Sequence, residues 1–556
     1  MNRLQKTALA HALKEKSDAT NSSPDEQGGN AKKINYPKRF LTYTLCLFLF
    51  FGCKKKSPPH EDCIIPPIVQ NYDLLSFKMD GADLALDSFP RTFYYPISDY
   101  EVEFSPFVEI TNEPQEILIN NRVITNESNN DLGLVKVNEP LPIKLTWCDT
   151  FVEEYLLIFT RHPIIQIDTD GQTIQNDPKI PIGFKINDPD FLINGMPERE
   201  LTSYAGIEFR GGSAQSYPKK AYGLELWKNS FGGEKIDAPL LGMRDDDDWI
   251  LDAMYIDKGR MRHRVSMDIW LDFQEVYYLH EEPDARSGVR GKMVEVFIDD
   301  RYRGIYMLSE RMDRKQLQLK EFENGADDFG VLYKSTHWGN GTVTFAGYWE
   351  EADSLNGYWD GWEHKYPDTE AEGIFWDPIS DFTRFVLYSS DDEFKNQIND
   401  HLQLGNAADY YMFLNLMRAD DNVGKNMFLA MYDTSEVFFI APWDLDGTWG
   451  RFWDGSATSP NVILTNGLFN RLIETNAGNF KNLLKQRWLS ARSGIFSKNS
   501  LMSYFEYYAE LMTLNGSFER EFTKWNMVVP LEDEMEHIST WLDDRLAYLD
   551  DYFDTL

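Results

Sequence analysis

Three side chains toward the C-terminal end of the chain have types and spacing that suit chemistry on a phosphate group. Asp421 stands five residues before Asn426, and Asp444 follows two short apolar runs and precedes Asp446 and Gly447. Mg²⁺ prefers hard oxygen ligands and keeps several of its waters, so one amide and one carboxylate from neighbouring loops suit it. In such an order the first aspartate orients an attacking hydroxyl, while the later amide and carboxylate hold the metal on the phosphates. The spacing therefore predicts phosphoryl transfer, with Asp421 as the catalytic residue.

A plainer explanation of the same segment stays open at this point. The chain holds 90 Asp and Glu residues, so acidic pairs near turns arise often by chance. The local sequences DNVG and DLDG are also ordinary turn sequences. A motif match alone does not decide between a metal site and two ordinary turns.

Residues 206–226 predict a strand, a Gly/Ser turn and a second strand. The turn RGGSAQS can present backbone N–H groups to an anion, and Arg210 stands at its edge. In the second strand Lys220 shares one face with Tyr222 and Leu224, because side chains alternate between the two faces of a strand. The Lys220 ammonium could therefore meet phosphates. A hairpin with solvated lysines is the alternative.

The elements that follow give an order that can be compared with known folds. Within residues 249–273, the spacing of Met261, Val265, Ile269 and Trp270 predicts a helix that Asp257 caps. Residues 293–310 predict two strands around a tight turn. The complete order is strand, turn, strand with lysine, helix, strand and strand, which is the order in the small lobe of a protein kinase.

Several motifs together resemble one family. The segments RGGSAQSYPKKAYGLEL, DKGRMRHRV, VEVFIDDRYRGIYMLSERMD and APWDLDGTWG are similar to those of the CotH (spore coat protein H) kinase family, and the resemblance covers residues 163–550. It implies an α+β chain with a protein-kinase-like, two-lobed fold. It also implies that the protein binds ATP and Mg²⁺ and phosphorylates Ser or Thr hydroxyl groups of a protein substrate.

The resemblance implies roles for individual residues. Asp421 corresponds to the catalytic aspartate, and Asn426 and Asp444 correspond to the metal ligands. The residues that correspond to nucleotide contacts are Arg210, Ser213, Lys219, Lys220 and Glu310. The chain departs from the family in two places, because His263 stands where the family usually has Asn and the phosphate turn reads Arg-Gly-Gly-Ser-Ala. Both departures concern nucleotide affinity more than the chemical step.

The N-terminal residues 1–53 read as an extension followed by a lipoprotein signal. A basic segment precedes the apolar stretch 40–53, which is short against the roughly 20 residues that span a bilayer. The sequence FGC that ends this stretch resembles a bacterial lipobox, which makes Cys53 the expected lipidation site and places the protein at the bacterial cell envelope. A single apolar anchor is the alternative. Cys63 and Cys148 could form a disulfide in an oxidising compartment.

Composition limits the class of protein and of partner. The formal net charge of −35 argues against nucleic acids and anionic lipid surfaces as partners, so we expect membrane contact only through the lipid anchor. With 42% hydrophobic and 14% aromatic residues, the chain is globular. The predicted parts are a tether at 54–70, an Ig-like β-sandwich at 71–160, a β-rich lobe at 161–320, an insertion at 321–380 and a helical lobe at 381–556.

Two functions other than phosphoryl transfer can be compared with the same sequence features. A non-catalytic surface lipoprotein that binds a polysaccharide or a protein stays open, because a fold does not fix a function. A glycosidase needs two carboxylates on opposite sides of a sugar bond. Asp444 and Asp446 are too close in sequence for that arrangement, so this reading is set aside.

Overall fold

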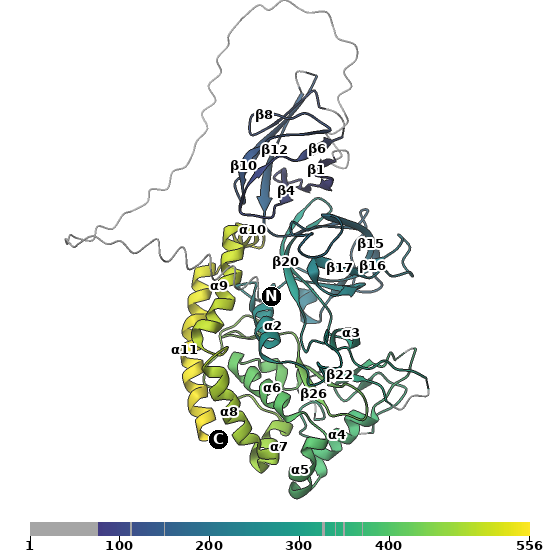
Figure 1. Cartoon of the computed structure of the whole chain (residues 1–556), viewed down its shortest axis with the longest axis vertical. Helices are drawn as coiled ribbons and strands as arrows, with labels where there is room; N and C mark the ends of the chain where they lie inside the picture. The colour runs from purple at the N-terminus through teal and green to yellow at the C-terminus, as the bar shows by residue number, and fades with distance from the viewer. Residues whose placement is uncertain are drawn as a thin grey trace, which may run out of the picture. The chain divides into compact units, whose positions relative to one another are not determined.

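The computed structural model describes residues 76–111, 114–148, 151–324, 328–337, 339, 341–347, 351–369 and 371–556. The signal, the tether, Cys53 and Cys63 lie outside these residues. Cys148 is disulfide-bonded. Among the described residues, no helix combines the length and the apolar character needed to cross a membrane. The described chain mixes α and β structure as predicted, with strands in its earlier part and most helices in its later part (Figure 1).

Residues 77–160 contain short strands in three sheets. Sheets of four strands (β2-β1-β6-β9) and six strands (β3-β4-β12-β11-β7-β8) contribute to one hydrophobic core. In β12, Tyr155, Leu157 and Phe159 are buried at alternate positions, as expected for a strand with one face on a core. The strands are β1 Phe77–Met79, β2 Ala82–Asp83, β3 Ala85–Asp87, β4 Thr92–Pro96, β5 Glu101–Phe104, β6 Phe107–Ile110, β7 Glu116–Ile119, β8 Arg122–Val123, β9 Ser128–Asn129, β10 Gly133–Lys136, β11 Leu141–Trp147 and β12 Phe151–Thr160.

The predicted β-rich lobe is a closed barrel with the strand order β13-β14-β15-β16-β19-β21-β20. Parallel pairing of β13 with β20 closes it. Alternate residues such as Leu224 and Val294 fill the barrel, whereas Ile250 and Met307 pack outward on the helical core. The strands are β13 Ile164–Asp168, β14 Ile180–Asn187, β15 Glu200–Arg210, β16 Ala221–Trp227, β19 Asp248–Asp252, β20 Gly291–Ile298 and β21 Tyr302–Ser309, and a separate small pair is β17 Ala238–Pro239 and β18 Asp245–Asp246.

A five-stranded sheet, β23-β24-β22-β25-β26, follows the barrel in sequence. The segment 321–380, predicted as an insertion, supplies three of its strands, and β22 pairs with β25 from beyond that segment. The strands are β22 Val331–Thr336, β23 Tyr358–Trp359, β24 Trp362–Tyr366, β25 Lys425–Met431 and β26 Phe439–Pro442. This sheet therefore connects the segment after the barrel to the loops that carry the predicted site.

The helices gather around α6, of which almost every residue is buried. Helix α6 packs against α8 and α11, and α11 runs beside α9 (Figure 1). The N-cap residue of α2 is Met261 and not Asp257 as predicted, but the Asp257 carboxylate still accepts the N–H groups of Met261 and Arg262, each at 2.6 Å, at the start of the helix. The helices are α2 Arg262–Phe273, α3 Arg314–Leu317, α4 Asp377–Tyr388, α5 Asp391–Gln397, α6 Leu404–Met417, α7 Gly467–Thr475, α8 Phe480–Arg492, α9 Lys498–Leu514, α10 Ser517–Lys524 and α11 Leu531–Thr555, with single 3₁₀ turns η2 Ser213–Ser216, η3 Leu240–Gly242, η4 Ile398–Asp400, η5 Asp420–Val423 and η6 Ala477–Asn479.

Glu534 of α11 is a buried carboxylate between two arginines. It accepts hydrogen bonds from Arg262 Nη2 at 2.5 Å and from Arg451 Nε and Nη2 at 3.0 and 2.5 Å. Burial by itself raises the pKa of this carboxyl, but Arg451 and Arg262 outweigh it and lower the pKa to about 2. These hydrogen bonds connect α11 to Arg262 at the start of α2 and to Arg451, which follows the loop of the predicted metal ligand Asp444.

This arrangement predicts a pH dependence of stability. The pKa of Glu534 is lower in the folded chain than its ordinary value of 4.5, so its contribution is complete above that pH and is lost as the pH falls toward 2. Urea unfolding of the wild type and of Glu534→Gln between those pH values should show a stability difference that shrinks as the pH falls. A difference that stays constant over this range would contradict the assignment.

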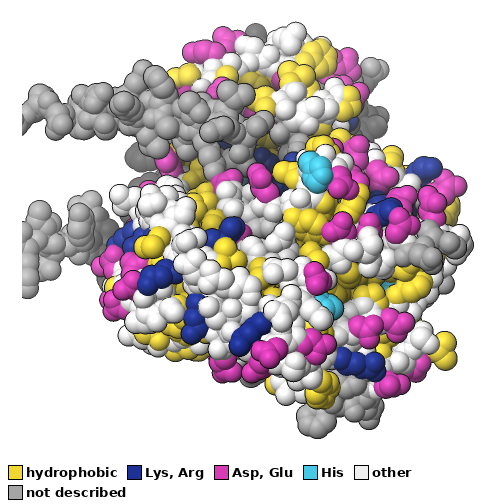
Figure 2. Space-filling view, turned by 60° about the horizontal axis from the view of Figure 1, so that its bottom comes forward, with side chains coloured by type: hydrophobic (Ala, Val, Ile, Leu, Met, Phe, Trp, Pro, Cys, Tyr) yellow, Lys and Arg dark blue, Asp and Glu magenta, His cyan; other side chains and the backbone are white. Residues whose placement is uncertain are grey.

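The surface is acidic but not uniformly so. Figure 2 shows Asp and Glu side chains spread over one face with Lys and Arg side chains between them. Many cationic side chains are paired with carboxylates, for example Arg492 with Asp550 at 2.9 Å and Lys136 with Glu101 at 2.8 Å. A buried or half-buried cation without such a partner is therefore a notable feature of this molecule.

Candidate functional site

The hairpin of β25 and β26 brings the two predicted metal ligands together. Asn426 lies at the start of β25 and Asp444 lies two residues after β26, and the amide Nδ2 donates to the Asp444 carboxylate Oδ2 at 3.2 Å. Both residues have a left-handed backbone, each with φ of 56°. Such a conformation costs energy for a residue with a side chain and often marks a functional site. The amide oxygen and the carboxylate are hard oxygen donors of the kind that Mg²⁺ takes.

Asp421 lies beside this pair, in the 3₁₀ turn η5 that precedes β25. Its side chain is 25% exposed, and its Oδ2 lies 3.7 Å from the Lys425 ammonium. Burial raises the pKa of Asp421; Lys425 opposes this rise, and the charge of Asp444 adds to it. A partly buried carboxylate with a raised pKa, reachable from solvent, can accept a proton from a substrate hydroxyl.

Arg210 ends β15 and reaches the same place from the barrel. Its guanidinium carbon lies 5.4 Å from the centroid of the Trp443 ring. The guanidinium group forms no hydrogen bond or ion pair within the described part of the chain. Burial lowers its pKa to about 10, with Arg311 contributing in the same direction and Asp444 opposing. The positive charge of Arg210 therefore lies near Asp444, although these two side chains form no ion pair with each other.

Lys334 of β22 is the second such cation. Its ammonium lies 6.0 Å from the centroid of the Phe428 ring and has no ion pair with any residue that the structure describes. Burial lowers its pKa, and Arg210 adds to this effect, while Glu363 and Asp444 oppose it. Two cations from different sheets thus face one carboxylate, which is an arrangement suited to a polyanionic ligand.

The turn between β15 and β16 lies beside Arg210. Gly211 has φ of 89°, and a Cβ atom there would come within 2.9 Å of the Ala214 Cβ, so the turn requires glycine. Lys220 Nζ donates to the carbonyl oxygen of Gln215 at 2.6 Å and so closes the turn. Ser213 is exposed at the start of η2. The phosphate contacts expected of Ser213 and Lys220 stay predictions.

Lys219 lies in a different environment from Lys220. It is fully buried, and its ammonium donates to Glu521 Oε1 at 2.8 Å and to the carbonyl oxygen of Ile305. Burial lowers its pKa to about 8, although Glu521 counteracts this effect. Because this ammonium is fully engaged inside the protein, its geometry gives no support to the predicted contact between Lys219 and a nucleotide.

Glu310 follows β21 directly and is also fully engaged. Its carboxylate accepts hydrogen bonds from the backbone N–H groups of Arg244 and Arg290 at 3.0 and 2.8 Å, from the Arg290 guanidinium at 2.6 Å and from Gln316 at 3.1 Å. Burial alone raises its pKa, but Arg290 lowers it overall. The Glu310 side chain therefore holds the backbone at Arg244 and Arg290 in place. A nucleotide contact by Glu310 stays a prediction.

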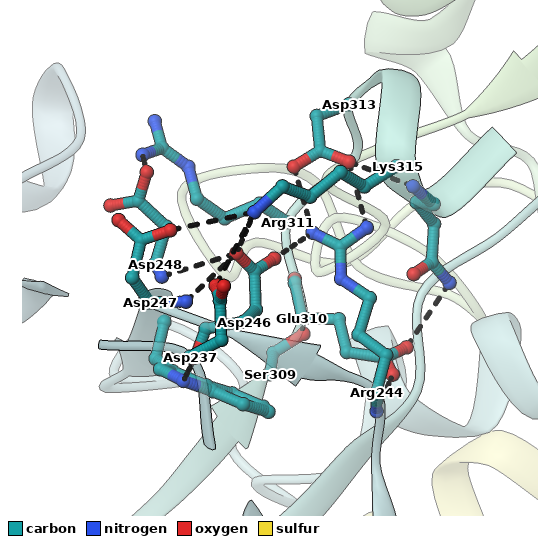
Figure 3. Close-up of polar contacts among 12 residues, drawn as sticks. Asp237, Arg244, Asp246, Asp247, Asp248, Ser309, Glu310, Arg311, Asp313 and Lys315 are labelled. Atoms are coloured by element: carbon teal, nitrogen blue, oxygen red, sulfur yellow. Dashed lines mark hydrogen bonds and ion pairs between the residues drawn. The ribbon is translucent and has the colours of Figure 1, made fainter. Parts of the chain in front are cut away.

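A dense group of charges lies next to Glu310 (Figure 3). Carboxylate oxygens of Asp237, Asp246 and Asp247 lie within 4.8 Å of one another. The Lys315 ammonium lies 3.5, 3.1 and 3.5 Å from these three carboxylates, and Arg244 binds Asp246 as well. A lysine thus already supplies the cation that these carboxylates need, so the group stabilises the fold and does not suggest a metal site.

A cavity of about 260 Å³ opens beside Arg210 on the outer face of the barrel. Its lining includes Glu208, Arg210, Gly211, Gly223, Ile250 and Arg311. Arg311, the residue after Glu310, lines it and is held by Asp248 at 3.0 Å. The cavity is bounded by the Gly/Ser turn after β15 and by Arg311, two residues after the end of β21.

His263, Asp446 and Asp252 also lie in this region, although the sequence did not indicate any of them as a site residue. The N–H group of Leu445 donates to His263 Nδ1 at 3.0 Å, so the proton of the neutral ring lies on Nε2. Burial lowers the pKa of His263, against the charges of Asp252 and Asp444, whereas burial raises the pKa of Asp446 well above its usual range. Because side chains alternate between the two faces of β19, the sequence could have placed Asp252 on the outer face of the barrel. Only the folded structure shows that this face lies beside His263.

The site therefore unites four of the eight residues predicted for catalysis, metal binding and nucleotide binding. Asp421, Asn426, Asp444 and Arg210 lie close together, and Lys334 joins them. The carboxylate of Glu310 and the ammonium of Lys219 are committed to other partners.

Comparisons with known proteins agree on one family. A family model described as "CotH kinase protein" matches residues 207–549. Inner spore coat protein H of Bacillus subtilis (strain 168) is 21% identical over 391 residues, which cover 69% of this chain and 93% of that protein. The matched segment begins in β15 and ends in α11, so it contains every residue of the site.

Proposed function

Because the chain belongs to the CotH kinase protein family, we propose that it is an ATP- and Mg²⁺-dependent phosphotransferase that acts on Ser or Thr hydroxyl groups of cell-envelope or secreted proteins. The observation that carries this proposal is that two cations near Asp444, Arg210 and Lys334, form no ion pair with any residue in the described part of the chain. In a chain of net charge −35, cations kept free beside carboxylates suit a ligand that brings both a polyanion and a metal ion.

The chemistry assigned to the residues follows from their charges. Arg210 and Lys334 bind the phosphates and offset their charge, and Asp421 orients the substrate hydroxyl and takes its proton. A bond forms between the hydroxyl oxygen and the γ-phosphorus, the bond from that phosphorus to the β–γ bridging oxygen breaks, and ADP leaves. Such a transfer depends mainly on positioning and on charge stabilisation, so few side chains suffice.

Asn426 and Asp444 would hold the metal. The amide Nδ2 of Asn426 donates to the Asp444 carboxylate, so this hydrogen bond orients the Asn426 side chain while its amide oxygen, a hard donor like the carboxylate, is left for the metal. When bound, Mg²⁺ supplies positive charge to the phosphates.

We also propose the architecture and the location that the sequence suggests. The barrel and the helical part would be the two lobes of a kinase-like fold, and residues 77–160 would be a β-sandwich that acts as a spacer or a binding module. Lipidation at Cys53 would anchor the protein to the bacterial envelope, where protein substrates with exposed hydroxyl groups are available. We expect no nucleic-acid partner.

Replacing Arg210 tests the phosphate contact. Arg210→Met keeps an apolar group against Trp443 but removes the charge, so we expect the affinity for a fluorescent ATP analogue to fall by about 10- to 100-fold, the loss typical of one charge-assisted hydrogen bond. Lys365→Met is the matched control, because Lys365 lies on β24 and its ammonium is bound to Glu363 at 3.1 Å. Equal affinities of the wild type and Arg210→Met would remove Arg210 from the site.

The reaction itself is tested with labelled nucleotide. Purified protein, Mg²⁺ and envelope proteins are incubated with ATP labelled in the γ-phosphate and, in parallel, in the α-phosphate. The proposal expects γ-label on Ser or Thr of a protein. Label from the α-phosphate would show AMP transfer instead, and no transfer from either nucleotide would favour a binding protein without catalytic activity.

A further inference from the structure

Asn422, next to the predicted catalytic aspartate, joins the two metal-binding segments. Its side chain is only 2% exposed. Its amide Nδ2 donates to the carbonyl oxygen of Asn426 at 2.9 Å and to that of Trp443 at 2.8 Å. One amide group thus spans the start of β25 and the residue just before Asp444.

Asn422 is itself fixed from the helical core. Its carbonyl oxygen accepts a hydrogen bond from Tyr410 Oη of α6 at 2.8 Å. The neighbouring carbonyl of Val423 accepts one from Asn466 Nδ2 at 2.9 Å. The amide therefore extends from an anchored backbone, and α6 sets its position.

The hydrogen bonds of the Asn422 amide act on a part of the backbone that is strained. Asn426 and Asp444 both have φ of 56°, and such conformations persist only when the surroundings hold them. Trp443 N–H donates to the Asn426 carbonyl at 3.0 Å, and Asn422 adds two more bonds to the same pair of residues. These contacts fix the two backbones whose side chains would bind the metal.

We propose that Asn422 is a positioning residue for the metal site, one that holds Asn426 and Asp444 at the separation a divalent cation needs. The inference rests on the proposed function, because it assigns the metal to those two residues. An amide suits the task, since its NH₂ group supplies two donors for two carbonyl oxygens. A carboxylate of the same shape has only acceptors and would repel both.

Asn415 offers a matched control. Its buried amide Nδ2 also donates to two carbonyl oxygens, those of Tyr411 and Leu464, each at 3.0 Å. It links α6 to the segment before α7 and is not part of the proposed site. Asn415→Asp therefore measures the stability cost of losing such a bridge without disturbing the metal-binding pair.

The experiment measures Mn²⁺ binding in the presence of a non-hydrolysable ATP analogue, by the loss of the free Mn²⁺ signal in electron paramagnetic resonance. We expect Asn422→Asp to weaken Mn²⁺ binding by about 10- to 100-fold, as loss of outer support typically does, and Asn415→Asp to leave it unchanged. Melting temperatures without ligand should fall for both variants. Asn422→Ala, which removes the donors without adding a charge, replaces Asn422→Asp if the latter does not fold.

The outcomes separate the two proposals. If the wild type binds no Mn²⁺ with the nucleotide analogue, the proposed function fails and the positioning role falls with it. If the wild type binds and the Asn422 variants bind equally well, the proposed function stands and the positioning role is wrong. If Asn415→Asp weakens Mn²⁺ binding as much as the Asn422 variants do, the effect is one of general stability and the inference is overturned.

Discussion

Asp421→Asn should lower kcat by about 100- to 10,000-fold, the range expected when a general base is removed. Asn has the size of Asp but carries no charge and accepts no proton, so the substrate hydroxyl loses both its orientation and its proton acceptor. Nucleotide affinity should change little, because the assigned phosphate contacts are Arg210 and Lys334. Single-turnover transfer of labelled γ-phosphate, together with binding of the ATP analogue, measures the two quantities separately.

Asp420→Asn is the control for this result. Asp420 is adjacent to Asp421 in sequence, but its carboxylate forms an ion pair with Arg418 Nε at 3.1 Å. We therefore do not expect this carboxylate to accept the proton of the substrate hydroxyl. Its replacement should alter kcat by no more than a few-fold. An Asp421→Asn variant that is folded and transfers phosphate at the wild-type rate would rule out Asp421 as the catalytic residue.

Glu521→Ala should lower the free energy of unfolding by about 3–5 kcal/mol, as expected when one partner of a buried ion pair is removed. The Glu521 carboxylate accepts from Lys219 Nζ at 2.8 Å, from Arg260 Nε at 2.8 Å and from the backbone N–H of Ile305 at 3.0 Å. All three donors are buried, so alanine would leave the Arg260 Nε–H and the Ile305 N–H groups unsatisfied and the Lys219 charge without its carboxylate. Urea unfolding at pH 7 measures the loss.

Two further variants test the cause of this loss. Lys219→Met/Glu521→Leu removes both partners and should recover part of the stability, since Arg260 keeps the carbonyl oxygens of Met254 and Asp257 as acceptors. Glu519→Ala, at an exposed position of the same helix, should change the free energy of unfolding by less than about 0.5 kcal/mol. If Glu521→Ala costs no more than Glu519→Ala, the ion pair does not hold α10 to the barrel.

The central part of the site was predictable because it is local in sequence. Asp421, Asn426 and Asp444 lie in a turn and a hairpin that follow one another, so pairing of β25 with β26 alone brings the two predicted metal ligands, Asn426 and Asp444, together. Arg210 was predictable for a similar reason, because it stands at the edge of a turn that needs Gly211. Local spacing and turn chemistry are sufficient to predict that residues of this kind lie close together.

The choice between Lys219 and Lys220 could not be made from the sequence. Adjacent residues at the start of a strand point to opposite faces, and both faces of this strand are covered. The Lys219 side faces Glu521 of α10, which lies 302 residues away in sequence. A contact over that separation has no local signal, so the sequence could not indicate that Lys219 is occupied.

Closure of the barrel and the role of Asn422 depend on contacts of the same long-range kind. The parallel pairing of β13 with β20 joins segments that no motif connects. The sequence DDNVG suggests a turn, and nothing in it shows that the Asn422 amide reaches the backbone at Trp443. Buried amides are recognised by their partners, and the fold alone supplies those.

Calorimetric titration of the wild-type protein with a non-hydrolysable ATP analogue, with and without Mg²⁺, tests the central claim most directly. We predict one-to-one binding that depends on Mg²⁺ and that Asp444→Asn abolishes or weakens strongly. Absence of binding, or binding that neither Mg²⁺ nor Asp444→Asn alters, would contradict the assignment of a nucleotide and a metal to this site.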